Sequence, residues 1–279
     1  MKLLTYKLQG DDKERLGVMC ANAFQRFYPL ETFQLYFKDM NDLIEHIKPE
    51  EMEMLRNSLS SVEGETLDYD EVIHCAPIPH PRQDIICLGM NFKDHGEESA
   101  RYKKEAFERE EEYPVYFSKR VNEATPDGGT IPSYPGLVDS LDYEAELGVI
   151  IGKDASHVKR EDAFEYVFGY TVINDVSARN VQTRHKQWYF GKSMDGFTPM
   201  GPFIVTEDVV KRPPVLSIKS QVNGVLRQHS STDRFIFDIP HVISELSSGM
   251  VLKAGTIISM GTPAGVGTVS YTHLTLPTT

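Results

Sequence analysis

The segment DYEAELGVIIGKD, residues 142–154, alternates acidic and apolar side chains in the manner of a β-strand. Neighbouring side chains of a strand point to opposite faces, so Glu144 and Glu146 share one face and lie about 7 Å apart. Asp142 precedes them on that face, whereas the opposite face is apolar and suited to a core. A solvated face, which antiparallel strands often have, would explain the acids simply. Alternatively, the carboxylates bind a hard divalent cation such as Mg²⁺ or Mn²⁺.

The composition of the chain is that of an ordinary globular protein. Its 279 residues are 40% hydrophobic and 25% charged, which allows one large domain or a small domain beside a larger one. The net charge of -12 disfavours nucleic acid as a partner, because nucleic-acid binders need a basic face. An anionic substrate would require a local positive patch or a bound metal ion.

The cysteines and the N-terminal residues give information on the cellular compartment of the protein. Cys20, Cys75 and Cys87 show no metal-ligand spacing and are odd in number, so we expect reduced thiols in a reducing compartment. The first ten residues, MKLLTYKLQG, lack the long apolar run of a signal peptide. No segment approaches the ~20 apolar residues of a membrane span. We therefore expect a cytoplasmic protein with no membrane partner.

A proline-rich stretch divides the chain. Residues 1–75 are predicted to form a small α/β unit. APIPHPRQ, residues 76–83, places three prolines in a stiff connector, which we interpret as the domain boundary. Residues 84–267 show mostly strand and turn patterns and form the second, larger unit.

Within these units, hydrophobic spacing predicts several elements. Apolar residues at helical spacing predict helices over 30–47, 49–59 and 159–168, and an apolar run predicts a strand over 84–92. The segment LSIKSQVNGVLRQ, residues 216–228, is typical of a β-hairpin, because an Asn-Gly pair favours a tight turn between strands.

Polar residues at the ends of two apolar strands indicate a site. Asp175 closes the strand YTVINDV, where a charge is costly without a partner. His95 and Glu98 follow the strand 84–92 and would share one face of a helix, a spacing that is more often structural than functional. Strand-end carboxylates with a nearby Lys and Gln suit a Mg²⁺ or Mn²⁺ site that keeps open positions for water or substrate.

Five motifs, in this order, resemble those of the fumarylacetoacetate hydrolase family: CLGMNFKDHGEE, DYEAELGVIIGK, GYTVINDVSARNVQ, GKSMDGFTPMGPFIV and GTPAGVG. They cover residues 84–267 in the order and approximate spacing of the family. The resemblance implies an α+β fold in which a mixed β-sandwich roll forms the catalytic domain. It further implies a small α/β N-terminal domain over residues 1–75, as in larger members, and a homodimer.

The resemblance also implies a metal site and a catalytic dyad. Glu144, Glu146 and Asp175 match the carboxylates with which the family binds Mg²⁺ or Mn²⁺. His95 and Glu98 match a His–Glu dyad that family hydrolases carry on a mobile lid helix.

Five further residues match or lie near substrate positions. Lys192 and Gln182 match positions that bind or polarise substrate and water. Thr262, in GTPAG, matches a contact to the substrate carboxylate. Arg101 and Lys119 are candidate anion partners on the strength of their place in the sequence alone.

The implied function is a metal-dependent hydrolase that cleaves a C–C bond in a β-diketo acid or an acylpyruvate-type 2-oxo acid. In that reaction Glu98, acting through His95, would activate a water held near Gln182. A decarboxylase or isomerase of a 2-oxo or 2-hydroxymuconate-type acid needs the same stabilisation of negative charge, so the motifs leave it as an alternative. A metal-stabilised binding protein without turnover and a purely structural β-domain with solvated acids are further alternatives.

The last twelve residues depart from the family pattern. No charged residue follows Lys253, and VSYTHLTLPT resembles the translation of a sequencing-library adapter. We expect residues 268–279 to be a non-native tail that replaces closing elements of the catalytic domain; a genuine Thr-rich tail is the alternative.

Overall fold

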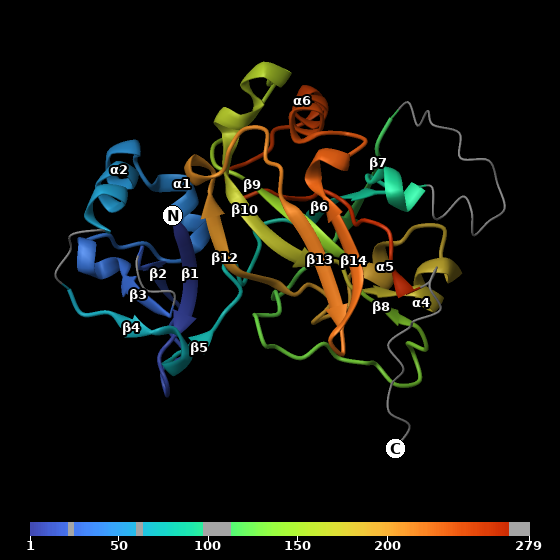
Figure 1. Ribbon diagram of the computed structural model, residues 1–279, viewed down its shortest axis with the longest axis horizontal. Coiled ribbons are helices and arrows are strands. Elements are labelled where there is room, and N and C mark those ends of the chain that lie inside the picture. Colours follow the sequence, from blue (N-terminus) through green and yellow to red (C-terminus); the bar gives the residue numbers. More distant parts are fainter. Residues whose placement is uncertain (22–24, 60–63, 97–112, 268–279) are drawn as a thin grey trace.

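The computed structural model describes residues 1–21, 25–59, 64–96 and 113–267. The expected tail at 268–279 lies outside these residues. The fold is α+β, as predicted, and a large mixed sheet dominates it (Figure 1). Its strands are β1 Lys2–Lys7, β2 Arg15–Met19, β3 Arg26–Pro29, β4 Leu67–Asp68, β5 Ile73–His74, β6 Ile85–Gly89, β7 Val115–Lys119, β9 Ala145–Ile151, β10 Val167–Asn174, β12 Met200–Thr206 and β15 Ile257–Ser259.

The remaining elements are short. Two small sheets pair β8 Leu141–Asp142 with β11 Ser177–Ala178, and β13 Ser217–Val222 with β14 Val225–Ser231. The α-helices are α1 Met40–His46, α2 Pro49–Ser58, α4 Arg179–Arg184, α5 Tyr189–Lys192 and α6 Ile239–Gly249. The 3-10 helices are η1 Leu30–Phe33, η2 Tyr69–Glu71, η3 Arg160–Tyr166, η4 Glu207–Val209 and η5 Thr232–Arg234.

The large sheet joins the N-terminal strands to the rest of the chain. Its order is β4-β3-β2-β1-β12-β10-β9-β15-β6-β7, with β5 beside β1. The joint is the antiparallel pair of β1 with β12, where Leu3 lies opposite Ile204. Figure 1 shows the N-terminal strands at one end of the molecule and α4 and α5 at the other. A domain boundary at residues 76–83 stays a prediction.

The strand β9 is buried along its whole length and on both faces. Ile150 packs into a core that it shares with β1 and α1, whereas Val149 and Ile151 pack into a second core with α6 and β15. Glu146, on the same face as Ile150, is 2% exposed. The solvated-face explanation of the acids is therefore wrong, because other elements cover that face.

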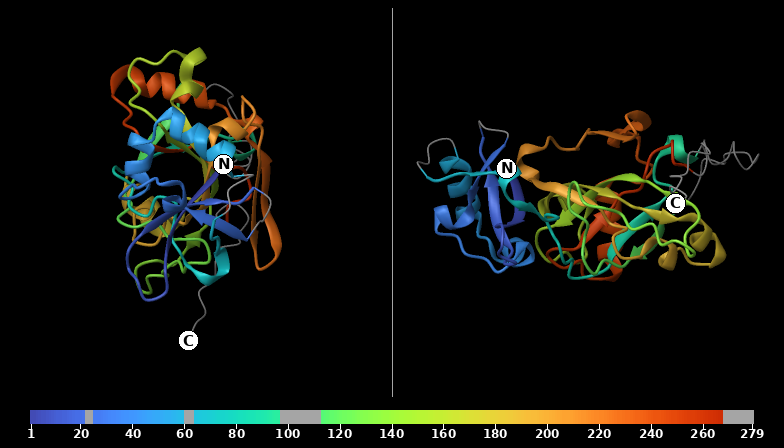
Figure 2. Two further views of the ribbon diagram at one scale, coloured as in Figure 1. Left: turned by 90° about the vertical axis from the view of Figure 1, so that its left-hand side faces the viewer. Right: turned by 90° about the horizontal axis from the view of Figure 1, so that it is seen from below.

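The hairpin β13–β14 forms as predicted and lies over one face of the large sheet (Figure 2). Asn223 and Gly224 have φ values of 51° and 75°, which a tight two-residue hairpin turn requires. The hairpin is tied to β9 by Gln228, whose side-chain oxygen accepts the Ala145 N–H at 3.0 Å. It thereby supplies part of the cover over the edge of β9 that carries the acids.

Two of the predicted helices differ from the structure. The helix predicted over 30–47 is split into η1 and α1, because Asp39 accepts the Asp42 N–H and so caps a new helix at Met40. Within the segment 159–168, residues 160–166 form the 3-10 helix η3 rather than an α-helix, and residues 167 and 168 begin β10. The helix predicted over 49–59 is confirmed as α2, with Pro49 at its first position. Within the described ranges, no helix has the length and hydropathy that spanning a bilayer requires.

The joint between β1 and β12 should carry much of the stability of the chain. Ile204 is fully buried in the core that both ends of the sheet share. We expect Ile204→Ala to lower the free energy of unfolding by about 2–5 kcal/mol, the range for deletion of a buried aliphatic side chain. Val209→Ala, at a site 57% exposed, is the control and should change it by less than about 0.5 kcal/mol. Urea denaturation measures both, and equal effects would show that the joint contributes little.

Candidate metal centre

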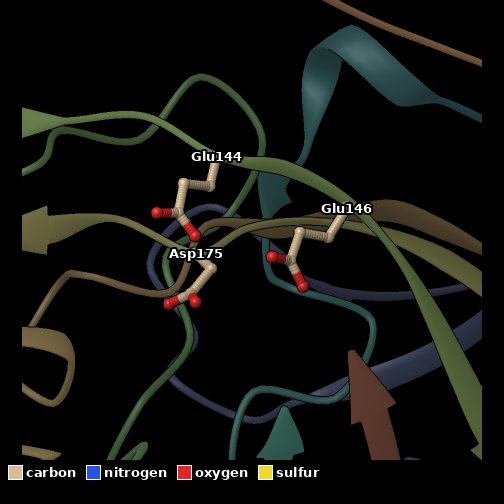
Figure 3. A group of neighbouring side chains, drawn as sticks. All are labelled: Glu144, Glu146 and Asp175. Atoms are coloured by element: carbon tan, nitrogen blue, oxygen red, sulfur yellow. The ribbon is translucent and has the colours of Figure 1, made fainter. Parts of the chain in front are cut away.

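Three buried carboxylates converge where β9 and β10 pair (Figure 3). Glu144 precedes β9, Glu146 lies within it, and Asp175 follows β10. The Asp175 N–H donates to the Glu144 carbonyl at 2.8 Å, which fixes the two strand ends against each other. One carboxylate oxygen from each residue lies within 4.8 Å of the others. The three residues predicted to bind a metal therefore face a common point.

Three cations surround these carboxylates. Lys192 Nζ lies 2.7 Å from Glu144 Oε2 and 2.5 Å from Asp175 Oδ2. Arg179 pairs with Glu144 at 2.6 Å and with Asp142 at 2.7 Å. Lys119 Nζ lies 2.8 Å from Asp175 Oδ1, and its hydrogen bonds go to the carbonyl oxygens of Val176 and Lys192.

The cations affect the pKa values of the carboxylates unequally. Burial would raise the pKa of Glu144, but the charges of Lys192 and Arg179 outweigh it and lower that pKa to about 2. In the case of Glu146, burial and the charges of Asp175 and Glu144 raise the pKa well above its ordinary value. Among the described residues, no cation lies within ion-pair distance of Glu146, whose Oε2 accepts from the Ser259 hydroxyl and the Gly261 N–H. Glu146 is thus the carboxylate whose charge is least compensated.

The residues fit a hard divalent cation. With all four buried carboxylates ionised, counting Asp142, the three cations leave one negative charge uncompensated. Asp175 Oδ1 is paired with Lys119 Nζ at 2.8 Å, and because a carboxylate oxygen has two lone pairs it retains one for a further ligand. Oxygen-only donors suit Mg²⁺ and Mn²⁺.

A cavity of about 200 Å³ opens beside Glu144 and Glu146, whereas Asp175 is fully buried and does not line it. Its lining combines acidic, cationic and apolar side chains: Leu88, Gly89, Met90, His95, Phe117, Glu144, Glu146, Arg179, Gln182, Trp188, Lys192 and Thr262. Trp188 packs edge-to-face on Phe117 with ring centroids 5.2 Å apart. A Cβ at Gly89 would lie 2.8 Å from the Trp188 ring, so this wall requires glycine there.

The structure brings together most of the residues that the sequence indicated. His95, Gln182, Lys192 and Thr262 all line the cavity beside the carboxylates. Lys119 does not line it: the side chain is fully buried behind Asp175, with its donors directed at the protein. Glu98 and Arg101 lie outside the described residues, so their predicted roles stay predictions.

Arg179 was not among the predicted site residues, although it touches more of the site than most of them. It pairs with two carboxylates, and its Nη1 donates to Gln182 Oε1 at 2.9 Å. The signal in the sequence was an arginine three residues before Gln182, which places both on one side of a short helix. Trp188 and Phe117 were also missed, because nothing local indicates that two aromatic residues so far apart meet.

Residues 84–277 match the family model described as fumarylacetoacetate (FAA) hydrolase C-terminal. This chain therefore belongs to the fumarylacetoacetate hydrolase family. Over 192 residues it is 45% identical to the oxaloacetate tautomerase YisK of Bacillus subtilis, an alignment that covers 69% of this chain and 62% of that protein. The chain thus spans less than two thirds of the length of this curated relative.

Two solved structures share the fold. A fumarylacetoacetate hydrolase from psychrophilic Exiguobacterium antarcticum is 35% identical, with a TM-score of 0.74 and coverage of 96% of this chain and 88% of that one. Maleylpyruvate hydrolase from Sphingobium sp. SYK-6, in complex with manganese(II) and pyruvate, is 29% identical, with a TM-score of 0.70 and coverage of 96% and 90%. The buried acidic triad and this manganese complex agree with the predicted cofactor, Mg²⁺ or Mn²⁺.

Binding of Mn²⁺ should strengthen as pH rises. The pKa of Glu146 is raised in the metal-free fold, so a cation must displace a proton from this carboxylate. We expect the Mn²⁺ affinity to fall as pH drops through that raised pKa, measured by calorimetric titration from about pH 5 to pH 9 with the proton release recorded in two buffers. Glu146→Gln should bind Mn²⁺ weakly and release no proton. A pH-independent affinity in the unaltered chain would contradict this role of Glu146.

Loss of Arg179 should destabilise the metal-free chain. Arg179→Met leaves Asp142 without its cation inside the protein, and breaking such a buried pair costs about 3–5 kcal/mol. Arg160→Met removes the exposed pair with Asp238 and should cost less than about 1 kcal/mol. Urea denaturation of both variants decides the point, and similar losses would show that the buried network is not a stability element.

Proposed function

We propose that this chain is a metal-dependent enzyme that cleaves a C–C bond by hydrolysis in a small β-diketo acid or acylpyruvate-type 2-oxo acid. The observation that carries the proposal is the meeting of Glu144, Glu146 and Asp175 beside a cavity whose lining includes the two glutamates together with Lys192, Gln182 and His95. Two family members, an oxaloacetate tautomerase and a maleylpyruvate hydrolase, act on small acids.

The charge of the site favours an anionic ligand together with the cation. The three protein cations and a divalent ion would carry five positive charges, whereas the four carboxylates carry four negative charges. One positive charge then remains for the ligand, which a single carboxylate would neutralise. A neutral ligand would leave that charge buried and uncompensated, which is costly.

When bound, a divalent cation would act as a Lewis acid that polarises the carbonyl next to the substrate carboxylate. The protein supplies further donors on the same side of the cavity. Two of the three N–H groups of Lys192 are bonded to Glu144 and Asp175, which leaves one for an oxygen that gains negative charge. Gln182 accepts from Arg179 through its oxygen, so its amide N–H groups are left for substrate or water.

His95 is the candidate acid–base group. Its imidazole lines the cavity and is the side chain there suited to take a proton from an attacking water and to return it to the leaving carbon. Glu98 is the proposed partner of His95 on the evidence of the sequence motif.

Tautomerisation of a 2-oxo acid is the second candidate. The 45% identity to an oxaloacetate tautomerase favours it, and the reaction needs the same donors for a developing negative charge. It differs from hydrolysis in that protons move while no C–C bond breaks.

The two candidates, and a binding protein without turnover, are separable by product analysis. The chain would be incubated with Mg²⁺ or Mn²⁺ and with acylpyruvates, oxaloacetate or a hydroxymuconate. Release of two acids from an acylpyruvate supports the hydrolase, and keto–enol interconversion of oxaloacetate without cleavage supports the tautomerase. Metal-dependent binding of these compounds with no turnover would contradict both.

His95 should affect turnover rather than metal binding. We expect His95→Ala to lower kcat by about a hundredfold, as for the loss of an acid–base group, with the Mn²⁺ affinity unchanged. His241→Ala, at a histidine of α6 that does not line the cavity, is the matched control and should leave kcat unchanged. Weakened Mn²⁺ binding with intact turnover in His95→Ala would show that His95 serves the metal instead.

A further inference from the structure

A short helical turn, residues 93–96, follows β6 and carries His95. The N–H groups of His95 and Gly96 both donate to the Phe92 carbonyl at 3.1 Å, which closes the turn. The side chain of His95 lines the cavity. Successive side chains of a helical turn point about 100° apart, so Asp94 projects from a different side of the turn than His95.

Asp94 binds this turn to the segment that follows the hairpin. Its Oδ2 accepts from the Ser230 hydroxyl at 3.1 Å and from Arg234 Nε at 2.7 Å, and its Oδ1 accepts from Arg234 Nη2. Two parallel hydrogen bonds between an arginine and a carboxylate fix direction as well as distance. Burial would raise the pKa of Asp94, but the hydrogen bonds from Arg234 and Ser230 outweigh it and lower that pKa. The carboxylate is therefore ionised at neutral pH and keeps its partners.

The chain just before the turn is held by the same segment. Asn91 Oδ1 accepts the Phe237 N–H at 2.7 Å, and Asn91 Nδ2 donates to the Phe237 carbonyl at 3.0 Å. Phe92 is fully buried and packs edge-to-face on Phe235, with ring centroids 4.8 Å apart. These contacts fix the chain as far as Phe92, and Asp94 holds the turn itself.

Strand β14 thereby contacts two edges of the cavity. Gln228 and Ser230 are two residues apart on β14, so their side chains share one face of the strand. Gln228 Nε2 donates to Thr262 Oγ1 at 2.7 Å, whereas Ser230 donates to Asp94. Thr262 and His95 both line the cavity. The same strand thus fixes the loop after β15 and the turn that carries the histidine.

We propose that Asp94 is a positioning residue that, through Arg234 and Ser230, sets where the His95 imidazole lies in the cavity. Proton transfer requires its two partners within hydrogen-bond reach, so a displaced imidazole slows the reaction. The metal-binding carboxylates come from other elements and stay in place. The proposal rests on the proposed function and deepens it, because it states what holds the acid–base group.

The kinetic test asks whether the ion pair acts through His95. With Mn²⁺ and an acylpyruvate or oxaloacetate, we expect Arg234→Met and Asp94→Asn each to lower kcat about tenfold and to change KM and the Mn²⁺ affinity less than about twofold. In a chain that already carries His95→Ala, the same changes should lower the residual kcat less than about twofold, because the group they position is gone.

Two further variants calibrate the kinetic effect. Arg234→Lys keeps the charge but not the paired hydrogen bonds, and should lower kcat only about threefold. Arg160→Met removes an exposed pair with Asp238, neither of which lines the cavity, and should leave kcat unchanged. The Arg234 variants suffice if Asp94→Asn does not fold, since Arg234 is half exposed.

A second measurement needs no turnover. In the chain labelled with ¹³C-histidine and loaded with Mg²⁺, which is diamagnetic, the His95 imidazole gives the NMR signal that His95→Ala lacks. We expect Arg234→Met to shift or broaden this signal, whereas the signal of His46, on α1, should keep its position.

Three outcomes would overturn the proposal: an unchanged kcat in Arg234→Met, a loss of kcat that is as large in the His95→Ala chain, or an unchanged His95 signal. The first and third would show that the turn is held without Asp94, and the second that the ion pair acts elsewhere. If the unaltered chain converts none of these acids, the proposed function fails, whereas the NMR comparison still decides whether Asp94 positions the imidazole.

Discussion

The structure depends on the burial of four carboxylates at one end of the pair β9–β10. Such a cluster is tolerable only where cations and hydrogen-bond donors are held against it. Lys119, Lys192 and Arg179 supply three charges from three different elements, and Ser259 and Gly261 support Glu146 with neutral donors. The positions of β7, α4, α5 and the loop after β15 follow from this requirement, because each must bring its residue to the same point.

The local sequence predicted the three acids, and the family resemblance added Lys192, Gln182, His95 and Thr262 around them. Period-two alternation placed Glu144 and Glu146 on one face, and a charge after an apolar strand indicated Asp175. Both predictions were possible because each pattern lies within a few consecutive residues. Whether that face is wet or buried depends on the cover from other elements, which alternation does not report. The Asn-Gly turn of the hairpin was predictable because its backbone conformation is a property of those two residues.

The residues that sequence analysis missed or misplaced all act across long separations. The local sequence predicts an exposed helix residue at Arg179. In the structure, the pairing of β8 with β11 brings Asp142 beside it. Lys119 is close to the site, but whether it faces ligand or protein depends on Val176 and Lys192, which lie 57 and 73 residues away. Gln228 has no local signal, since its hydrogen-bond partners Ala145, Ser220 and Thr262 belong to β9, β13 and the loop after β15. Family resemblance transfers single residues, whereas such networks require the fold.

Two properties of the site bear on which reaction it can catalyse: its charge and the groups that exchange protons. A cation held by Glu144, Glu146 and Asp175, together with Lys192, favours any ligand that gains negative charge on an oxygen, and hydrolysis and tautomerisation share that need. Charge alone therefore does not choose between these reactions. The choice must depend on where protons are accepted and donated, because one reaction consumes a water and the other only relocates a proton. His95, which lines the described cavity, is the group to which we assign this proton exchange.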